Sequence, residues 1–171
     1  MNNPKDKSLL IKAEQGDSIS QLQIGKTEAN KGNYKTAIEW LNRSRALRNA
    51  EAALYLGRIM LKQKKRAEAF ECFMHARELA RSYVAVAPIN HREIWFYLGV
   101  CYFEGIGTPR NVNEGLIYLT KAAKDCDSDE TISFSGLTEA QLYLSRKYKD
   151  GDGVKLNLHE ANKWLKKARP E

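Results

Sequence analysis

The feature that most constrains this chain is an internal repeat of small residues at helical spacing. A small residue follows an aliphatic one in each of four segments: LQIGKTEA, LYLGRIML, FYLGVCYF and LYLSRKYK. A second set of segments follows: AIEWLNRS, AFECFMHA, GLIYLTKA and ANKWLKKA. In each, the first residue and those three, four and seven later share one face of an α-helix. The small residues, called anchors below, are Gly25, Gly57, Gly99 and Ser145 in the first set and Ala37, Ala69, Gly115 and Ala161 in the second.

Paired anchors predict paired helices. Small residues belong where two helices approach closely, and the bulky residues beside them fill the gaps. One pair cannot bury both of its apolar faces, so the pairs must stack. The sequence therefore predicts an all-α fold, a right-handed α-solenoid of about four stacked helix pairs. We expect disorder over residues 1–4 and a single domain over 5–171, with repeats at about 17–48, 49–90, 91–136 and 137–169.

The anchor spacing in the last two repeats exceeds that in the first two by four residues, and the extra residues carry glycines. The segment DGDG, with Asp150 and Asp152, raises the possibility of a calcium loop. Such a loop needs oxygen ligands at alternate positions, and Ile106 stands where the third repeat should match Asp152. The aligned glycines instead predict a structural turn. Asn111 with Glu114, and Asn157 with Glu160, have the spacing of a helix-capping box.

Composition and motifs exclude several classes of protein. No apolar run approaches the roughly 18 residues that span a membrane, and no secretory core is present, so we expect a cytoplasmic protein without membrane insertion. Cys72, Cys101 and Cys126 are odd in number and form no CxxC, which predicts buried thiols, at least for the first two. No catalytic, metal or nucleotide motif is present. We expect no enzyme activity, no cofactor and no metal site.

Two segments resemble a known family: LGVCYFEGIGTPRNVNEGLIYLTKAA and LSRKYKDGDGVKLNLHEANKWLKKA. They are similar to the Sel-one-like repeat (SLR) family, a tetratricopeptide-like (TPR-like) helical repeat family. Its pattern is a Leu-Gly, a Tyr three residues on, Gly-x-Gly, a polar turn and an Ala-led helix. Tyr102 and Tyr148 take the tyrosine position. The junction over Lys12 to Gly25 is also similar, which implies a lone capping helix at residues 5–15.

The first two repeats resemble the related tetratricopeptide repeat more closely. They depart from it at Gln21 and Ala53, where that pattern has a large aromatic residue. Two stretches interrupt the period. The second helix of the second repeat is expected to run on toward Pro88, and the segment with Asp125, Asp127, Asp129 and Glu130 is either a binding loop or a tolerated insertion.

The resemblance implies that a protein or peptide binds on a concave face lined by the first helix of each pair. Three of four repeats place a cation directly after the first anchor, which favours an acidic partner. The third repeat offers an apolar pocket in its place. The alternative is a solvated helix face that carries long cations. The predicted groove residues are Lys26, Asn30, Arg58, Lys62, Phe96, Val100, Phe103, Arg146 and Lys149.

An interaction module is therefore the expected function: an adaptor, scaffold, chaperone or inhibitor/immunity-type protein. The alternative is a nucleic-acid-associated solenoid, because the net charge is +7 and basic residues gather at KQKKR (62–66) and near the end of the chain. Its aromatic residues argue against nucleic acid, because they fall on helical core positions rather than on a stacking surface. These are Tyr55, Tyr97, Tyr118, Trp40 and Trp164.

Overall fold

The computed structural model describes residues 4–82, 91–124 and 137–169, and every regular element in these ranges is an α-helix. The predicted all-α fold is confirmed. The chain forms two compact units, residues 1–89 and 90–171, which are described here one at a time. That all four repeats form one domain stays a prediction. Of residues 1–4, which were expected to be disordered, residues 1–3 lie outside the described residues and Pro4 begins the first helix.

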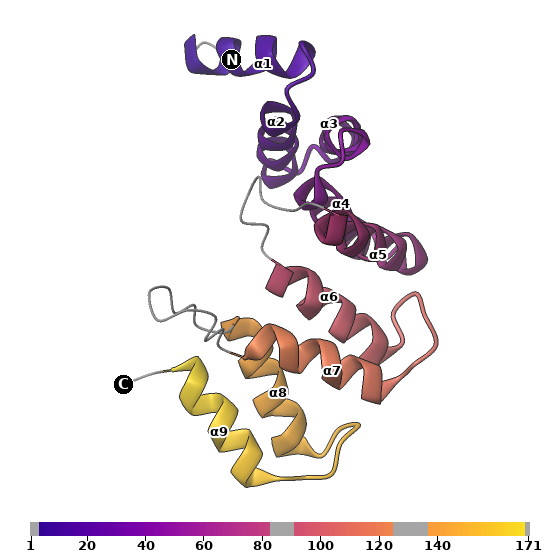
Figure 1. The fold of residues 1–171 in the computed structure, drawn as a ribbon, viewed down its shortest axis with the longest axis vertical. Coiled ribbons are helices and arrows are strands. Elements are labelled where there is room, and N and C mark those ends of the chain that lie inside the picture. Colours follow the sequence, from indigo (N-terminus) through magenta and orange to yellow (C-terminus); the bar gives the residue numbers. More distant parts are fainter. Residues whose placement is uncertain (1–3, 83–90, 125–136, 170–171) are drawn as a thin grey trace. The chain divides into compact units, whose positions relative to one another are not determined.

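The described residues of the first unit form five helices (Figure 1). Helix α2 packs against α3, α4 packs against α5, and the two pairs meet where α3 contacts α4. Helix α1 packs on α2 in the manner of a lone second helix, which is the capping role expected for residues 5–15. The bounds are α1 Pro4–Glu14, α2 Ser18–Asn30, α3 Tyr34–Ala46, α4 Ala50–Lys62 and α5 Arg66–Ser82.

The second unit repeats this arrangement with four helices. Helix α6 packs against α7, α8 packs against α9, and α7 contacts α8. Helix α5 of the first unit, at 17 residues, is longer than any other helix in the described ranges, as expected, but its continuation toward Pro88 lies outside the described residues. So do the acidic segment 125–130 and Cys126. The bounds are α6 His91–Glu104, α7 Val112–Ala123, α8 Thr138–Asp150 and α9 Leu158–Ala168.

The anchors lie where the two helices of a pair touch. A Cβ added to Gly25 would lie 2.6 Å from Cγ of Leu41, and one added to Gly115 would lie 2.8 Å from the backbone nitrogen of Phe103. Both distances are too short for carbon, so the helices reach their observed spacing only because the side chain is absent. At the fourth anchor, the Ser145 hydroxyl donates a hydrogen bond of 2.8 Å to the Ala161 carbonyl, which is the partner anchor.

In each unit a buried glutamine joins the first helix of a pair to the helix that precedes it in the chain. The Gln21 side-chain amide donates to the Ala13 carbonyl of α1 at 2.9 Å, and Gln141 donates to the Ala123 carbonyl of α7 at 3.0 Å. Each glutamine stands four residues before a first anchor and satisfies a carbonyl at the end of the preceding helix. This explains the departure from an aromatic residue at Gln21.

The glycine-containing turns have the predicted structural role. Gly151 ends α8 in the left-handed conformation at φ 66°, and the Asn157 side chain accepts a hydrogen bond of 3.1 Å from the Glu160 backbone. In a complete capping box, the Glu160 side chain would accept a hydrogen bond from the Asn157 backbone N–H. Here that N–H donates instead to the Tyr148 carbonyl at 2.9 Å. Asn111 makes the same two bonds, to the Glu114 backbone and the Tyr102 carbonyl. Each cap therefore ties the turn to the preceding helix.

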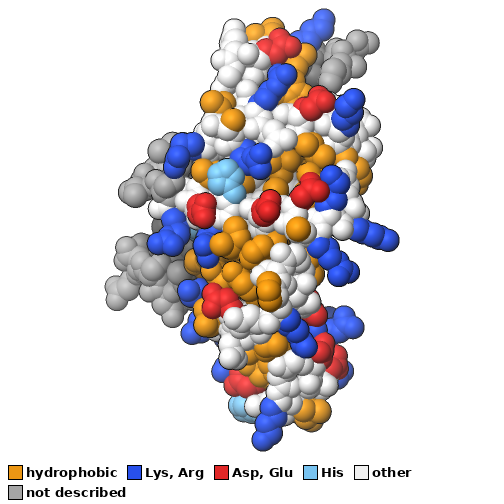
Figure 2. Space-filling model, turned by 90° about the vertical axis from the view of Figure 1, so that its right-hand side faces the viewer, with side chains coloured by type: hydrophobic (Ala, Val, Ile, Leu, Met, Phe, Trp, Pro, Cys, Tyr) orange, Lys and Arg blue, Asp and Glu red, His pale blue; other side chains and the backbone are white. Residues whose placement is uncertain are grey.

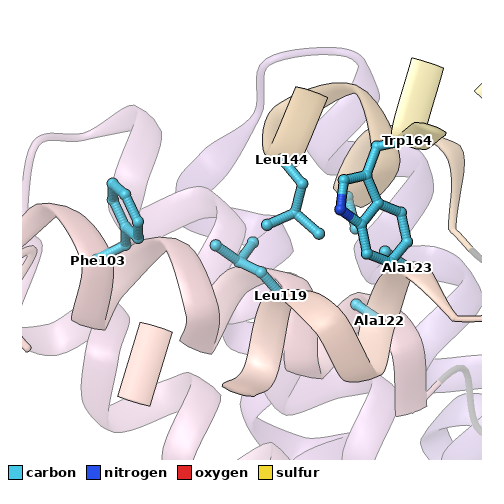
Figure 3. Packing of buried hydrophobic residues seen from close by; sticks show 7 residues of the cluster. Phe103, Leu119, Ala122, Ala123, Leu144 and Trp164 are labelled. Atoms are coloured by element: carbon cyan, nitrogen blue, oxygen red, sulfur yellow. The ribbon is translucent and has the colours of Figure 1, made fainter. Parts of the chain in front are cut away.

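Buried side chains from all four helices meet in the core of the second unit. Leu119 of α7 and Leu144 of α8 point toward each other, with Trp164 of α9 beside them (Figure 3). Phe103 of α6 completes this cluster and is fully buried. The apolar contact between the two helix pairs is therefore continuous within the unit.

We expect Gly115→Ala to lower the free energy of unfolding, although alanine favours helix over glycine by about 1 kcal/mol. The added methyl group would strike the backbone of α6, and overpacking of this kind costs about 1–3 kcal/mol. Gly57→Ala is the matched comparison, because the three atoms nearest its methyl group belong to the Phe73 side chain and not to backbone. Urea unfolding should show the larger loss for Gly115→Ala. A gain in stability for both variants would contradict the close approach.

Candidate partner-binding surface

In the first unit, the predicted cations Lys26 and Arg58 meet at one tyrosine. Lys26 Nζ and the Arg58 guanidinium each lie 4.7 Å from the centre of the Tyr55 ring. Lys26 also forms an ion pair of 2.9 Å with Glu51, which joins α2 to α4. The hydrogen bond that Lys26 donates to Glu51 raises the pKa of Lys26, so the amine stays charged. These contacts hold two cations in place over an aromatic ring.

The remaining predicted residues of the first unit lie apart from this group. Lys62, at the end of α4, is exposed and leans toward Tyr34 of α3, with its amine 6.0 Å from the ring centre. Asn30 is exposed at the last position of α2. Among the predicted residues of this unit, Lys26 and Arg58 therefore form one group with Glu51 and Tyr55.

In the second unit, the predicted apolar residues separate into two kinds. Phe96 and Val100 are half-buried and pack against the core cluster, so part of each side chain faces outward. Phe103 is fully buried and has no surface to offer a partner. Its helical position was read correctly, but the side chain turns into the core, where it contacts Tyr143 edge-on at 5.9 Å between ring centres. Tyr143 contacts Phe96 in the same way at 6.2 Å.

A second polar group, missed by the sequence analysis, is centred on Lys147. Its amine lies 2.6 Å from a Glu104 carboxylate oxygen and 2.5 Å from one of Asp152. The Tyr143 hydroxyl donates a further hydrogen bond to Glu104. Lys147 thus joins α6, α8 and the following turn, and its side chain is only 12% exposed. Both aspartates of the DGDG turn form ion pairs with side chains, Asp152 with Lys147 and Asp150 with Arg146.

The charges of this group stabilise one another. Burial raises the pKa of Glu104, but hydrogen bonds from Lys147 and Tyr143 outweigh burial and hold that pKa below its ordinary value. Burial likewise lowers the pKa of Lys147, and its bonds to Asp152 and Glu104 outweigh burial and raise it. Burial and the bond to Glu104 both raise the pKa of Tyr143. At neutral pH the ion pair is therefore intact and the phenol is protonated.

Arg146 and Lys149 do not join this group. The Arg146 side chain is 83% exposed and its ion pair with Asp150, at 3.7 Å, lies within its own helix. Lys149 is exposed on the same helix. The cation that packs against α6 is Lys147, one residue beyond the predicted position. A sequence signal for the aromatic partner existed, because a tyrosine stands two residues before the anchor in LYLG, FYLG and LYLS.

The described residues offer little for catalysis. Cys72 and Cys101 are buried thiols, as predicted, and burial raises the pKa of both, that of Cys101 to about 12. Such thiols are poor nucleophiles at neutral pH. No group of three His, Cys, Asp or Glu side chains in the described ranges could hold a metal ion. None of the described helices is long and apolar enough to cross a membrane.

Figure 2 shows charged side chains of both signs on one face of the molecule. Lys and Arg side chains are scattered there among acidic and hydrophobic ones. A surface that follows a phosphate backbone needs its cations gathered along one path.

Comparison with known proteins identifies the family. The family model described as "Sel1 repeat" matches residues 24–49, 96–125 and 138–169, which together make up half of the chain. The chain belongs to the Sel1 repeat family. The match includes the first pair of helices and both pairs of the second unit, and it leaves out α4 and α5. The predicted family is thereby confirmed.

Solved structures agree with this assignment. The protein is similar to c5321, a protective antigen of uropathogenic Escherichia coli with an SLR fold. The identity is 26% and the TM-score 0.73, over 95% of this chain and 32% of that one. A Sel1 repeat protein from Oxalobacter formigenes is 23% identical, with a TM-score of 0.69 over 95% and 62% of the two chains. MamA is 22% identical, with a TM-score of 0.60 over 93% and 80%.

These likenesses confirm the predicted α-solenoid fold class. Sel1 repeats generally form non-catalytic scaffolds for protein–protein interaction. The chain spans about a third of the length of c5321 and less than two thirds of the Oxalobacter protein. A search of curated protein sequences found no match.

We expect Lys147→Met to lower the free energy of unfolding by about 1 kcal/mol at pH 7, because it removes a network rather than an isolated pair. The Glu104 pKa is lowered by folding, so this stabilisation is complete above the ordinary carboxyl value of 4.5 and is lost as the pH falls through the folded value. The difference between wild type and variant should therefore shrink as the pH is lowered below 4.5.

Arg146→Met is the matched control, because it removes an exposed pair within one helix and should change stability little at either pH. Urea unfolding at both pH values measures the two differences. A Lys147→Met effect that is equal to the Arg146→Met effect, or that grows in acid, would contradict the role given to Lys147.

Proposed function

We propose that this protein is an interaction module, acting as an adaptor, scaffold, chaperone or inhibitor, that binds an acidic protein or peptide on the first-helix faces of its repeats. The observation that carries the proposal is the placement of Lys26 and Arg58 over one tyrosine ring on neighbouring first helices. Cations fixed in this way form charge-assisted hydrogen bonds with carboxylates at a reduced entropic cost.

The aromatic ring makes this surface selective. Tyr55 is half-buried, so its ring positions both cations while part of it remains accessible. Aromatic residues and arginine are enriched among the residues that dominate binding energy at interfaces. Carboxylates placed about one helix spacing apart, with an apolar side chain between them, are the complementary partner chemistry. Glu51 limits the net charge, which favours a defined acidic segment over any polyanion.

The second unit supports a complementary apolar subsite. Phe96 and Val100 are half-buried on α6, and Leu142 of α8 is 37% exposed. The Lys147 network fixes α8 against α6 behind these residues. Because the supporting side chains are locked by packing, a partner meets a preformed surface. Arg146 and Lys149 remain proposed contacts at the exposed margin of α8.

The proposal predicts that Lys26→Glu with Arg58→Glu weakens partner binding by about tenfold or more, because two favourable charge contacts become repulsive. The matched control is Lys35→Glu with Arg66→Glu, which makes the same change in net charge at two exposed cations on second helices. Capture from the cells that make this protein identifies partners, and titration with an aspartate-rich synthetic peptide measures the surface directly. Circular dichroism checks that each variant remains helical.

The comparison of the two variants decides the result. If a partner is lost from the first-helix variant and kept by the control, the proposed surface is supported. Equal binding to wild type and both variants would contradict it. Capture of nucleic acid, released steeply by salt from all forms, would instead support the nucleic-acid alternative.

A further inference from the structure

The outer face of α9 carries exposed leucines. At one of these positions, the matching residue of other second helices is buried. The residue four positions after the second anchor is 0% exposed in α3 and α7, where it is Leu41 and Leu119. In α9 the same position is Leu165, which is 38% exposed. Leu158, one turn before the anchor, is 57% exposed. Both leucines are therefore exposed on α9, whereas α8 packs on the corresponding side of α7.

The second unit contains a direct example of how such a face is covered. On α7, Val112, Leu116 and Leu119 face the core cluster, and α8 packs across them with Leu144. By the spacing of the repeats, the corresponding α9 residues are Leu158, Asn162 and Leu165. The geometry that fits this face is therefore another helix, seated on α9 as α8 is seated on α7.

The charges around the face specify the chemistry of that helix. Residues 155–169 contain five cations, Lys155, Lys163, Lys166, Lys167 and Arg169, and one acidic residue, Glu160. The corresponding residues 109–123 contain two cations, Arg110 and Lys121, and one acidic residue, Glu114. A second copy of this chain is a poor occupant, because the net charge of +7 makes two copies repel each other. Carboxylates beside leucines would complement the face.

We propose that the outer face of α9, formed by Leu158, Asn162, Leu165 and Lys166, is a docking site for an acidic amphipathic helix of another protein. The helix would place its apolar residues against the two leucines and its carboxylates against the flanking cations. This is the helix-in-groove mode of recognition, with the groove supplied by an uncovered repeat face. The site is separate from the first-helix faces, so each proposal can fail alone.

A labelled peptide tests the site. It has the sequence of Thr138–Asp150 with two replacements, Arg146→Glu and Lys149→Glu, which reverse its charge and keep the residues by which α8 packs, Lys147 included. Fluorescence anisotropy measures its binding to the whole chain, to Leu158→Ser with Leu165→Ser, and to Ile117→Ser. Ile117 is the control because it is a similarly exposed aliphatic residue on α7. The unaltered basic peptide is the control for charge.

We expect the acidic peptide to bind wild type and Ile117→Ser equally and the double serine variant about tenfold more weakly, since two apolar contacts are lost. The basic peptide should bind poorly. No binding of the acidic peptide, or equal binding to all three proteins, would overturn the proposal. So would dimerisation that the leucine substitutions abolish, seen by light scattering, or leucine-dependent binding to phosphatidylglycerol vesicles in place of the peptide.

Discussion

Contact between paired helices at residues without large side chains is the constraint on which the rest of this structure depends. At Gly25 and Gly115 an added Cβ would overlap the partner helix, so the helix spacing follows directly from the sequence. Ser145 meets the same constraint with a hydroxyl that is satisfied by the facing carbonyl. Once this spacing is set, the neighbouring bulky residues are buried, and each pair presents one face to the next pair.

Polar contacts then fix how one pair sits on another. Gln21 and Gln141 each bond a carbonyl at the end of the preceding helix, inside an apolar contact where an unpaired carbonyl would cost about 1–3 kcal/mol. In the second unit, Lys147 adds an ion-pair network between α6 and α8. These contacts specify one arrangement of the helices, and the surfaces available to partners are consequences of it.

Much of the fold could be predicted from the sequence, because small anchors and helical periodicity depend on local spacing. The helix pairs, the glycine turns, the capping asparagines and the buried thiols of Cys72 and Cys101 follow from such patterns. The polar contacts between pairs could not be predicted, because they depend on rotation about each helix axis. A difference of one residue, about 100° of rotation, separates the exposed Arg146 from the largely buried Lys147. The rotation of α6 likewise places Phe103 in the core. The proposed binding surfaces therefore rest on side-chain positions that periodicity alone does not fix.

A double-mutant cycle between Gly25 and Leu41 tests the central constraint most directly. Gly25→Ala should destabilise the protein by overpacking, and Leu41→Ala should destabilise it by leaving a cavity. When the two are combined, the new methyl group enters the space that the leucine leaves. Urea unfolding should then show the double variant to be more stable than the sum of the single effects by about 1–3 kcal/mol. Additive effects would contradict the account, because they would mean that the glycine does not determine how closely the two helices pack.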